Sequence, residues 1–256
     1  MTVHFIGAGP GAADLITVRG QELLKSCPVC LYAGSLVSQD MLGYCPPGTR
    51  LIDTAPLALD AIIDHCVEAT NSGADVARLH SGDLAIWSAM GEQIARLKQL
   101  GIACSVTPGV PAFAAAAAAM GRELTVPGLA QSLVLTRMQG RATPLPSSES
   151  LEAFAATGAT MALHLSIHAI ANICDRLRAH FPPETPVVVV ARASWPDEMI
   201  LRGTLADIAA KVEVAHITRQ ALIFVGTGLR DDISATSALY SASYQRRFRG
   251  DPGAGT

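Results

Sequence analysis

The sequence has no hydrophobic run long enough to cross a membrane, although half of its 256 residues are hydrophobic and its mean hydropathy is positive. The longest candidate stretch, from Phe113 to Met120, contains six consecutive alanines and falls far short of the roughly 20 apolar residues that span a bilayer. Residues 1–7 also lack the positive charge and the long apolar core of a secretory signal. We therefore expect a soluble, cytoplasmic protein with no membrane partner.

Concentrated positive charge is absent as well. The 19 basic and 22 acidic residues are scattered along the chain and sum to a formal net charge of −3. Nucleic-acid binding requires basic residues that are gathered on one face or along one helix. We therefore expect no nucleic-acid partner.

A disulfide framework is also absent, because the six cysteines show no regular spacing and the chain is long enough to fold without cross-links. Cys27 and Cys30 have the spacing of a redox motif. Such a motif places its first thiol at a helix N-terminus, where the dipole stabilises the thiolate, whereas this pair follows a helical stretch and enters a predicted strand. We predict buried, reduced thiols, with redox chemistry as the alternative.

Metal-ligand spacing is missing from the sequence. A structural zinc site would need a second cysteine pair, and none is present. His164 and His168 are four residues apart, but no glutamate follows the first histidine, so the helical zinc-protease motif is incomplete. We expect no bound metal.

What the chain does contain is a regular alternation of short apolar runs with helical periodicity. The predicted strands are 3–6, 29–32, 76–79, 102–106, 133–136, 160–165, 187–191 and 222–225. The predicted helices are one behind the first glycine turn, 88–100, a small-residue helix after Pro111, 167–180 and 205–212. This alternation predicts an α/β fold with mostly parallel or mixed sheets. We place α/β domains at residues 1–112 and 113–235, an exposed loop at 141–150 and a polar tail at 236–256.

The first strand leads into a glycine loop. Gly7, Gly9 and Ala12 formally satisfy the G-x-G-x-x-G/A pattern of dinucleotide sites, so an NAD-dependent oxidoreductase is an alternative. That motif also needs an acidic side chain about 20 residues further on, and residues 32–35 offer no carboxylate nearby. Pro10 also removes an amide from a loop that would have to donate amides to pyrophosphate. A tight turn that merely requires glycine explains the pattern equally well.

Three motifs taken in order resemble those of the tetrapyrrole (uroporphyrinogen/precorrin) methylase family. They are Gly7-Ala8-Gly9-Pro10-Gly11, Leu79-His80-Ser81-Gly82-Asp83 and Pro108-Gly109-Val110. The resemblance covers about residues 1–230. It implies two α/β domains with folded S-adenosylmethionine in the cleft between them, a precorrin as the small-molecule substrate, and a homodimer.

Further segments are similar to the branch of this family that methylates precorrin-4 at C11 to give precorrin-5 in corrin (vitamin B12, cobalamin) biosynthesis. They are residues 32–35, 135–137, 164–166, 192–198 and 203–205. Uroporphyrinogen methylases typically carry an aspartate where this chain has Ala33 or Gly34, which disfavours the earliest reaction of the family. The alternatives are methylation at another precorrin or cobalt-precorrin position, and a tetrapyrrole-binding protein without activity.

The resemblance also implies a set of cofactor contacts, carried over by position. These residues are Pro10, Ser81, Gly82, Asp83, Ile86, Pro111, Ala112, Leu165 and Ala193. Asp83 can accept hydrogen bonds from polar groups of the cofactor, and Ile86 and Leu165 offer apolar surface to adenine. Pro111 replaces a hydroxyl residue that is common there, so this chain would have to use its backbone at that position.

The chemistry that the resemblance implies requires geometry more than acids and bases. Methyl transfer from a sulfonium to carbon needs nucleophile, methyl and sulfur in line, so orientation supplies most of the rate gain. We therefore name no catalytic acid or base. Because the substrate carries many carboxylates, we expect arginines to hold it; Arg137 and Arg192 follow predicted strands and are the candidates, with surface ion pairs as the alternative.

Overall fold

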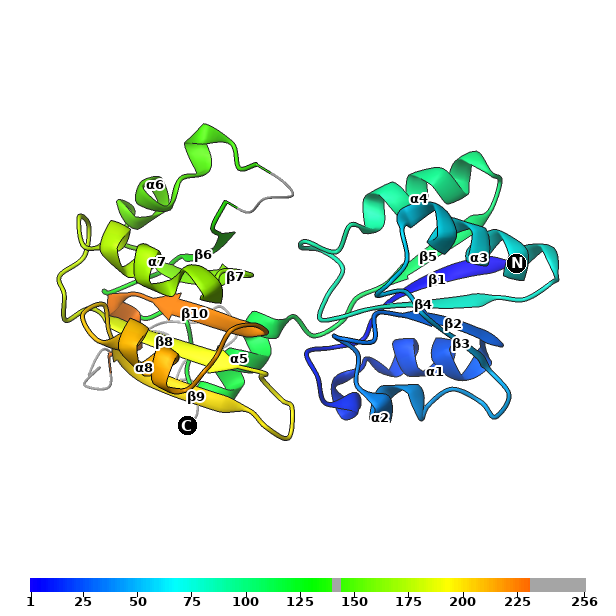
Figure 1. Ribbon diagram of the computed structural model, residues 1–256, viewed down its shortest axis with the longest axis horizontal. Helices are drawn as coiled ribbons and strands as arrows, with labels where there is room; N and C mark the ends of the chain where they lie inside the picture. Colours follow the sequence, from blue (N-terminus) through cyan, green and yellow to red (C-terminus); the bar gives the residue numbers. More distant parts are fainter. Residues whose placement is uncertain (140–143, 231–256) are drawn as a thin grey trace, which may run out of the picture.

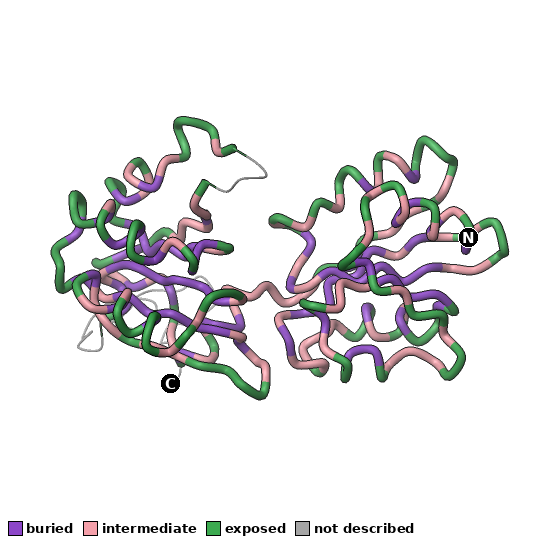
Figure 2. Tube along the Cα trace, viewed as in Figure 1, coloured by how far each residue is buried: buried purple, intermediate pink, exposed green. Residues whose placement is uncertain are grey.

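A computed structural model describes residues 1–139 and 144–230 and contains two five-stranded sheets, each covered by helices on both faces (Figure 1). The first sheet is built before residue 108 and the second after residue 132. In Figure 2 buried residues follow the strands of both sheets, while exposed residues follow the outer sides of the helices. None of the helices in the described ranges combines the length and the apolar character that a bilayer crossing requires.

The first sheet is entirely parallel, in the order β3-β2-β4-β1-β5. Its strands are β1 (Thr2–Gly7), β2 (Val29–Tyr32), β3 (Arg50–Asp53), β4 (Val76–His80) and β5 (Ala103–Thr107). Its helices are α1 (Val18–Ser26), α2 (Gln39–Leu42), α3 (Leu59–Asn71) and α4 (Met90–Gln99). β4 is buried along its whole length and β1 is buried from Phe5 to Gly7, as expected of central strands that are covered on both faces.

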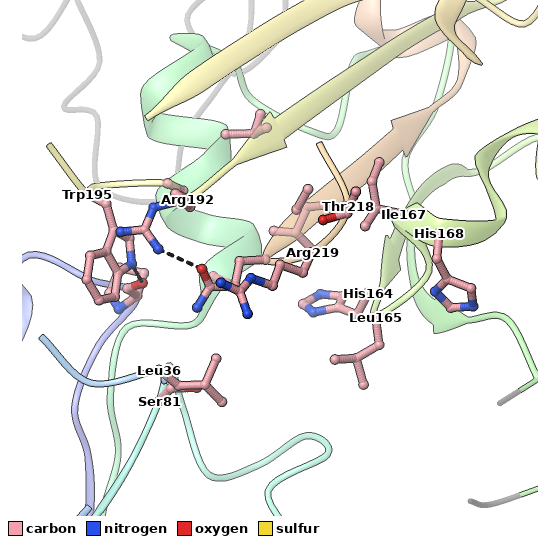
Figure 3. Close-up of a pocket in the computed structure, with 17 residues that line it drawn as sticks. Leu36, Ser81, His164, Leu165, Ile167, His168, Arg192, Trp195, Thr218 and Arg219 are labelled. Atoms are coloured by element: carbon pink, nitrogen blue, oxygen red, sulfur yellow. Dashed lines mark hydrogen bonds between the residues drawn. The ribbon is translucent and has the colours of Figure 1, made fainter. Parts of the chain in front are cut away.

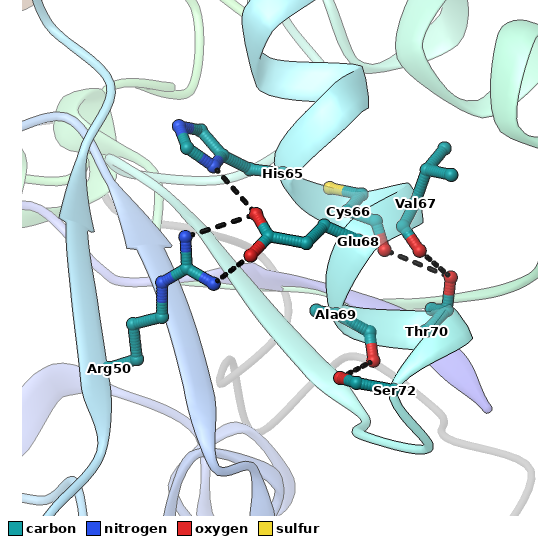
Figure 4. Close-up of polar contacts among 8 residues, drawn as sticks. All are labelled: Arg50, His65, Cys66, Val67, Glu68, Ala69, Thr70 and Ser72. Atoms are coloured by element: carbon teal, nitrogen blue, oxygen red, sulfur yellow. Dashed lines mark hydrogen bonds and ion pairs between the residues drawn. The ribbon is translucent and has the colours of Figure 1, made fainter.

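Two separate cores cover the two faces of this sheet. Phe5 packs with α3 and α4 on one face, whereas Ile6, the next residue, packs with α1 and α2 on the other. This alternation follows from the opposite directions of successive side chains in a strand. At the edge, Arg50 of β3 donates two hydrogen bonds to the carboxylate of Glu68 on α3, at 2.8 and 3.1 Å (Figure 4).

The second sheet is mixed, in the order β6-β7-β10-β8-β9, and only the β6–β7 pair is parallel. Its strands are β6 (Leu133–Arg137), β7 (Thr160–His164), β8 (Pro186–Ala191), β9 (Met199–Thr204) and β10 (Ala221–Val225). Its helices are α5 (Ala112–Met120), α6 (Leu151–Ala155), α7 (Ile170–Leu177) and α8 (Ile208–Val214). Short 3-10 turns occur at Ala13–Leu15, Ser147–Glu149, Ile167–Ala169 and Thr227–Leu229.

The alanine-rich helix α5 lies on one face of the second sheet, and α6, α7 and α8 lie on the other (Figure 1). Ala115 and Ala116 are buried against Ala162 and Phe224, because side chains this small let the helix backbone approach the sheet closely. The helix ends where Gly121 takes a left-handed conformation with φ of 64°, as helices commonly do.

All eight predicted strands are present, but the sequence interpretation omitted two strands and several helices. β3, β9, α2, α3 and α6 were not predicted. The helix expected at 167–180 begins with a 3-10 turn and its α-helical part ends at Leu177. The predicted boundary near Ala112 falls at the first residue of α5, between the two sheets. The expected tail at 236–256 and part of the expected loop at 141–150 lie outside the described residues.

Candidate active site

Three glycines bring the three sequence motifs together at the carboxyl ends of the adjacent strands β4, β1 and β5. A Cβ atom on Gly7 would lie 2.5 Å from the backbone nitrogen of Gly109, and one on Gly109 would lie 2.2 Å from the carbonyl oxygen of Gly82. Both distances are far shorter than real contacts allow. The loops can pack this closely only because residues 7 and 109 are both glycine.

Backbone hydrogen bonds hold two of these loops side by side. The nitrogen of Gly82 donates to the Gly9 carbonyl at 2.7 Å, and the nitrogen of Gly9 donates to the Gly82 carbonyl at 3.1 Å. Both glycines have positive φ, 77° at Gly9 and 66° at Gly82. The turn that follows β4 is thereby fixed against the glycine loop after β1.

Asp83 connects the turn after β4 to the loop after β5. Its Oδ1 accepts a hydrogen bond from the nitrogen of Ala85 at 2.7 Å, and its Oδ2 accepts one from the nitrogen of Gly109 at 2.8 Å. Both carboxylate oxygens therefore already have backbone donors. Asp83 shapes the site, and its predicted contact with the cofactor stays a prediction.

Two adjoining hollows of about 350 and 400 Å³ lie between the two sheets, and Figure 3 shows the residues that line the smaller one. The residues common to both are Pro10, Leu36, Ser81, Ala112, His164 and Leu165. Each of the nine residues predicted to contact the cofactor lines one hollow or the other. We call these two hollows together the cleft.

Several exposed apolar side chains face the cleft. Leu36, Trp87 and Leu165 line it and are 42, 44 and 68 % exposed. Trp87, from the loop after β4, stacks on His164 at the end of β7 with ring centroids 4.7 Å apart. The cleft therefore offers apolar and aromatic surface from both domains, which suits a flat, conjugated ligand.

Strained backbone is concentrated at the cleft. Trp87, Ala89, Leu165, Arg192 and Gln220 all line it and have φ between 49° and 55°, a region that residues with side chains rarely adopt. Such conformations persist only where surrounding structure enforces them, and they cluster at functional sites. These φ angles cannot be predicted from one amino-acid sequence.

Two histidines that line the cleft, the buried His80 and the half-buried His164, are neutral near pH 7. Burial lowers the pKa of His164 to about 4, and burial together with the charge of Arg78 lowers the pKa of His80 to about 3. The Nε2 atoms of both rings are buried without a hydrogen-bond partner. The sequence interpretation considered His164 only as half of an incomplete zinc motif.

A buried polar network of Arg78 also lines the cleft. Its Nε donates to Oε1 of Gln93 and its Nη1 donates to Oγ1 of Thr54, both at 3.1 Å. Arg78 lies inside the run that predicted β4, so the sequence interpretation treated it as part of a strand and did not recognise it as a residue of the site.

Side chains of the second domain hold the glycine loop across the cleft. The indole nitrogen of Trp195 donates to the carbonyl of Pro10 at 2.9 Å, and the nitrogen of Ala12 donates to Oγ of Ser194 at 3.0 Å. A Cβ on Gly11 would lie 2.2 Å from the Trp195 ring. We call these contacts the Trp195 clasp. The contact with Ser194 occupies the Ala12 amide, a donor that a dinucleotide site would leave free for pyrophosphate.

The two arginines predicted to hold substrate differ in position. Arg192 lines the cleft, donates to Asp197 and to Gln220 at 2.6 Å each, and lies 4.2 Å above the Trp195 ring. Its hydrogen bond lowers the pKa of Asp197. Arg137 donates to the carbonyl of Met138 and does not line the cleft. Both predicted substrate contacts stay predictions.

A carboxylate lies closer to the end of β2 than the sequence predicted. We expected no carboxylate near residues 32–35, yet Asp53, at the end of the neighbouring strand, accepts a hydrogen bond from the nitrogen of Gly34 at 2.9 Å. The pairing of β2 with β3 places it there. Asp53 also accepts a hydrogen bond from the nitrogen of Ala55 and does not line the cleft. It is therefore not placed to bind the ribose of a dinucleotide.

The cysteine pair lies in the core of the first domain. Cys27 and Cys30 are 1 and 0 % exposed. Burial raises the pKa of the Cys27 thiol to about 11, and a hydrogen bond with Cys45 together with burial raises the pKa of the Cys30 thiol. Both are therefore protonated at neutral pH. Within residues 1–139 and 144–230, no three His, Cys, Asp or Glu side chains are grouped as a metal would require.

The fold and the cleft define a two-domain α/β enzyme with a small-molecule site between its domains. A model of the tetrapyrrole (corrin/porphyrin) methylases matches residues 2–209, and the chain belongs to this family. It is 62 % identical to a precorrin-4 C(11)-methyltransferase of a Sinorhizobium species, covering 98 % of this chain and 99 % of that one.

Two solved structures are also similar. The crystal structure of a cobalt precorrin-4 methyltransferase of cobalamin biosynthesis matches with a TM-score of 0.87 and 41 % identity, over 90 % of this chain and 96 % of that one. A uroporphyrin-III C-methyl transferase of Thermus thermophilus, complexed with S-adenyl homocysteine, matches with a TM-score of 0.76 and 27 % identity, over 90 % and 94 %.

Proposed function

We propose that the chain is an S-adenosylmethionine-dependent methyltransferase of corrin biosynthesis that transfers a methyl group to C11 of precorrin-4, giving precorrin-5. The observation that carries the proposal is the cleft, where the loops after β1, β4 and β5 meet under residues of the second domain. An identity of 62 % to a precorrin-4 C(11)-methyltransferase over nearly the whole chain supports the choice of reaction.

The residues around Gly82 suit a folded nucleoside cofactor. A Cβ on Gly82 would lie 3.7 Å from the nitrogen of Ala112, so glycine leaves room beside an amide at the start of α5. Ser81 and Pro111 line the same space, and Ile86 and Leu165 add apolar surface. We propose that these residues, with Pro10, Asp83 and Ala193, hold S-adenosylmethionine, which supplies an electrophilic methyl group when bound.

Catalysis on this proposal is by positioning. Asp83 is the one carboxylate among the described residues that line the cleft, and both of its oxygens accept backbone hydrogen bonds. His80 and His164 are neutral near pH 7. The loops fixed by Asp83 and the Trp195 clasp orient the two ligands, and the acceptor carbon of a reduced, conjugated macrocycle is already electron-rich.

The activity is tested by incubating the protein with S-adenosylmethionine and precorrin-4. Mass spectrometry should show that the tetrapyrrole gains one methyl group and that S-adenosylhomocysteine is released. Cobalt-precorrin-4 in a parallel reaction decides whether the preferred ring contains the metal. If neither tetrapyrrole gains mass while the protein is folded, the proposed function is wrong.

Calorimetry separates this proposal from a nicotinamide enzyme. The Trp195 clasp occupies the Ala12 amide, a donor that pyrophosphate would need, so we expect S-adenosylhomocysteine to bind and NADH to give no heat of binding. Binding of NADH alone would favour the oxidoreductase alternative. The homodimer and the cytoplasmic location stay proposals, and sedimentation analysis of the purified protein tests the first.

A further inference from the structure

Arg219, immediately before β10, carries an unmatched positive charge at the cleft. It is exposed, lines the smaller hollow, and makes no hydrogen bond or ion pair with any described residue (Figure 3). Arg192, across the same hollow, is matched by Asp197 at 2.6 Å. Of the two arginines on this side, Arg219 is the one whose guanidinium is available for a ligand.

No acidic side chain is present among the described residues that line the same hollow as Arg219. They include two arginines and neither an aspartate nor a glutamate. This local excess of basic groups stands in a chain whose net charge is −3. A hollow lined by one sign of charge attracts ligands of the other sign.

The backbone that carries Arg219 is held in place by its neighbour Gln220. The Gln220 side chain donates to the carbonyl of Ser35 in the first domain and accepts from Arg192, both at 2.6 Å. Its own carbonyl accepts from the nitrogen of Arg192 at 2.8 Å. These contacts keep Gln220 at a φ of 53°. Arg219 therefore combines a fixed backbone with a free, planar donor group.

We infer that Arg219 binds a peripheral carboxylate of the tetrapyrrole substrate, and this inference rests on the proposed function. A guanidinium pairs with a carboxylate through two parallel hydrogen bonds, which fixes orientation as well as adding affinity. The carboxylate of the cofactor is the other possible source. Arg219 lines the smaller hollow. Of the proposed cofactor residues that line one hollow alone, Ala193 lines the smaller one and four line the larger one, which favours the substrate; the four are Gly82, Asp83, Ile86 and Pro111.

Kinetics of Arg219→Ala test the inference. Loss of a charged hydrogen-bond pair should lower kcat/KM for precorrin-4 about tenfold to a hundredfold, mainly through KM. The KM for S-adenosylmethionine and the calorimetric affinity for S-adenosylhomocysteine should be unchanged. Arg219→Lys keeps the positive charge but cannot donate two parallel hydrogen bonds to one carboxylate, so it should recover part of the lost kcat/KM.

Arg19→Ala is the matched control, because Arg19 is an exposed arginine of α1 that does not line the cleft and its replacement changes the net charge equally. The inference is overturned if Arg219→Ala changes kcat/KM no more than this control does. It is also overturned if Arg219→Ala lowers the affinity for S-adenosylhomocysteine by as large a factor as it lowers kcat/KM for precorrin-4. The arginine would then bind the cofactor.

A binding measurement keeps the inference separate from the proposed function. Uroporphyrin, a stable polycarboxylate tetrapyrrole, should quench the tryptophan fluorescence of the wild-type protein and bind Arg219→Ala more weakly. A wild-type protein that binds uroporphyrin but methylates no precorrin contradicts the proposed function alone, and equal affinities of the two proteins contradict the inference alone. A wild-type protein that binds no tetrapyrrole contradicts both.

Discussion

Gly109 carries the tightest backbone contact of the site. Its missing Cβ would lie 2.2 Å from the carbonyl oxygen of Gly82, and neither backbone can move without disturbing the Asp83 hydrogen bonds. We predict that Gly109→Ala lowers the free energy of unfolding by at least about 2 kcal/mol and abolishes binding of S-adenosylhomocysteine. Urea denaturation and calorimetry measure the two effects.

Gly91 provides the control for this substitution. It lies in α4, is exposed, and has no atom within 4 Å of a built Cβ. Because alanine favours a helix over glycine, Gly91→Ala should raise the free energy of unfolding by about 0.5–1 kcal/mol. Equal effects of the two substitutions would contradict the close packing of the three loops.

His164 makes stability depend on pH. Burial lowers its pKa to about 4, below the ordinary value of 6.5, so the unfolded state binds the proton more tightly. The stabilisation from the neutral ring is complete above pH 6.5 and is lost as the pH falls toward 4, up to about 3 kcal/mol. We predict that His164→Phe loses less stability than the wild type between pH 7 and 4.5 in chemical denaturation. Parallel pH curves for the two proteins would refute this, and His168→Phe, at an exposed site, is the control.

At the scale of the elements, the Trp195 clasp couples the glycine loop after β1 to the loop between β8 and β9. Gly11 leaves the space that the indole ring fills. We predict that Gly11→Ala lowers the free energy of unfolding by about 1–3 kcal/mol by displacing the ring. In the Trp195→Ala background the same substitution should cost little. Additive effects in this double-mutant cycle would show that the ring and the loop do not interact.

Elements with continuous apolar runs could be predicted from the sequence, and elements at the edges could not. β2 matches its predicted bounds because Val29, Cys30 and Leu31 are buried on both faces. β9 was missed because it is an edge strand with no fully buried residue, so its composition does not distinguish it from a loop. The helix α3 has four buried residues among thirteen, and its pattern was not recognised.

At the scale of the whole molecule, the sequence motifs predicted two domains and many of the residues that line the cleft. They did not predict the contacts that join the two domains across the cleft. Pro10 and Trp195 are 185 residues apart, and no local pattern predicts that an indole nitrogen meets that carbonyl. Arg192 and Arg137 were chosen because they follow strands, yet only Arg192 lines the cleft. The free arginine, Arg219, precedes a strand instead, so the same reasoning passed over it.

The position of the transferred methyl group tests the account most directly. The protein is incubated with precorrin-4 and S-adenosylmethionine labelled with carbon-13 in its methyl group, and the product is examined by NMR. The account predicts one labelled methyl group on C11. Label on any other carbon, or an unlabelled macrocycle, would contradict it.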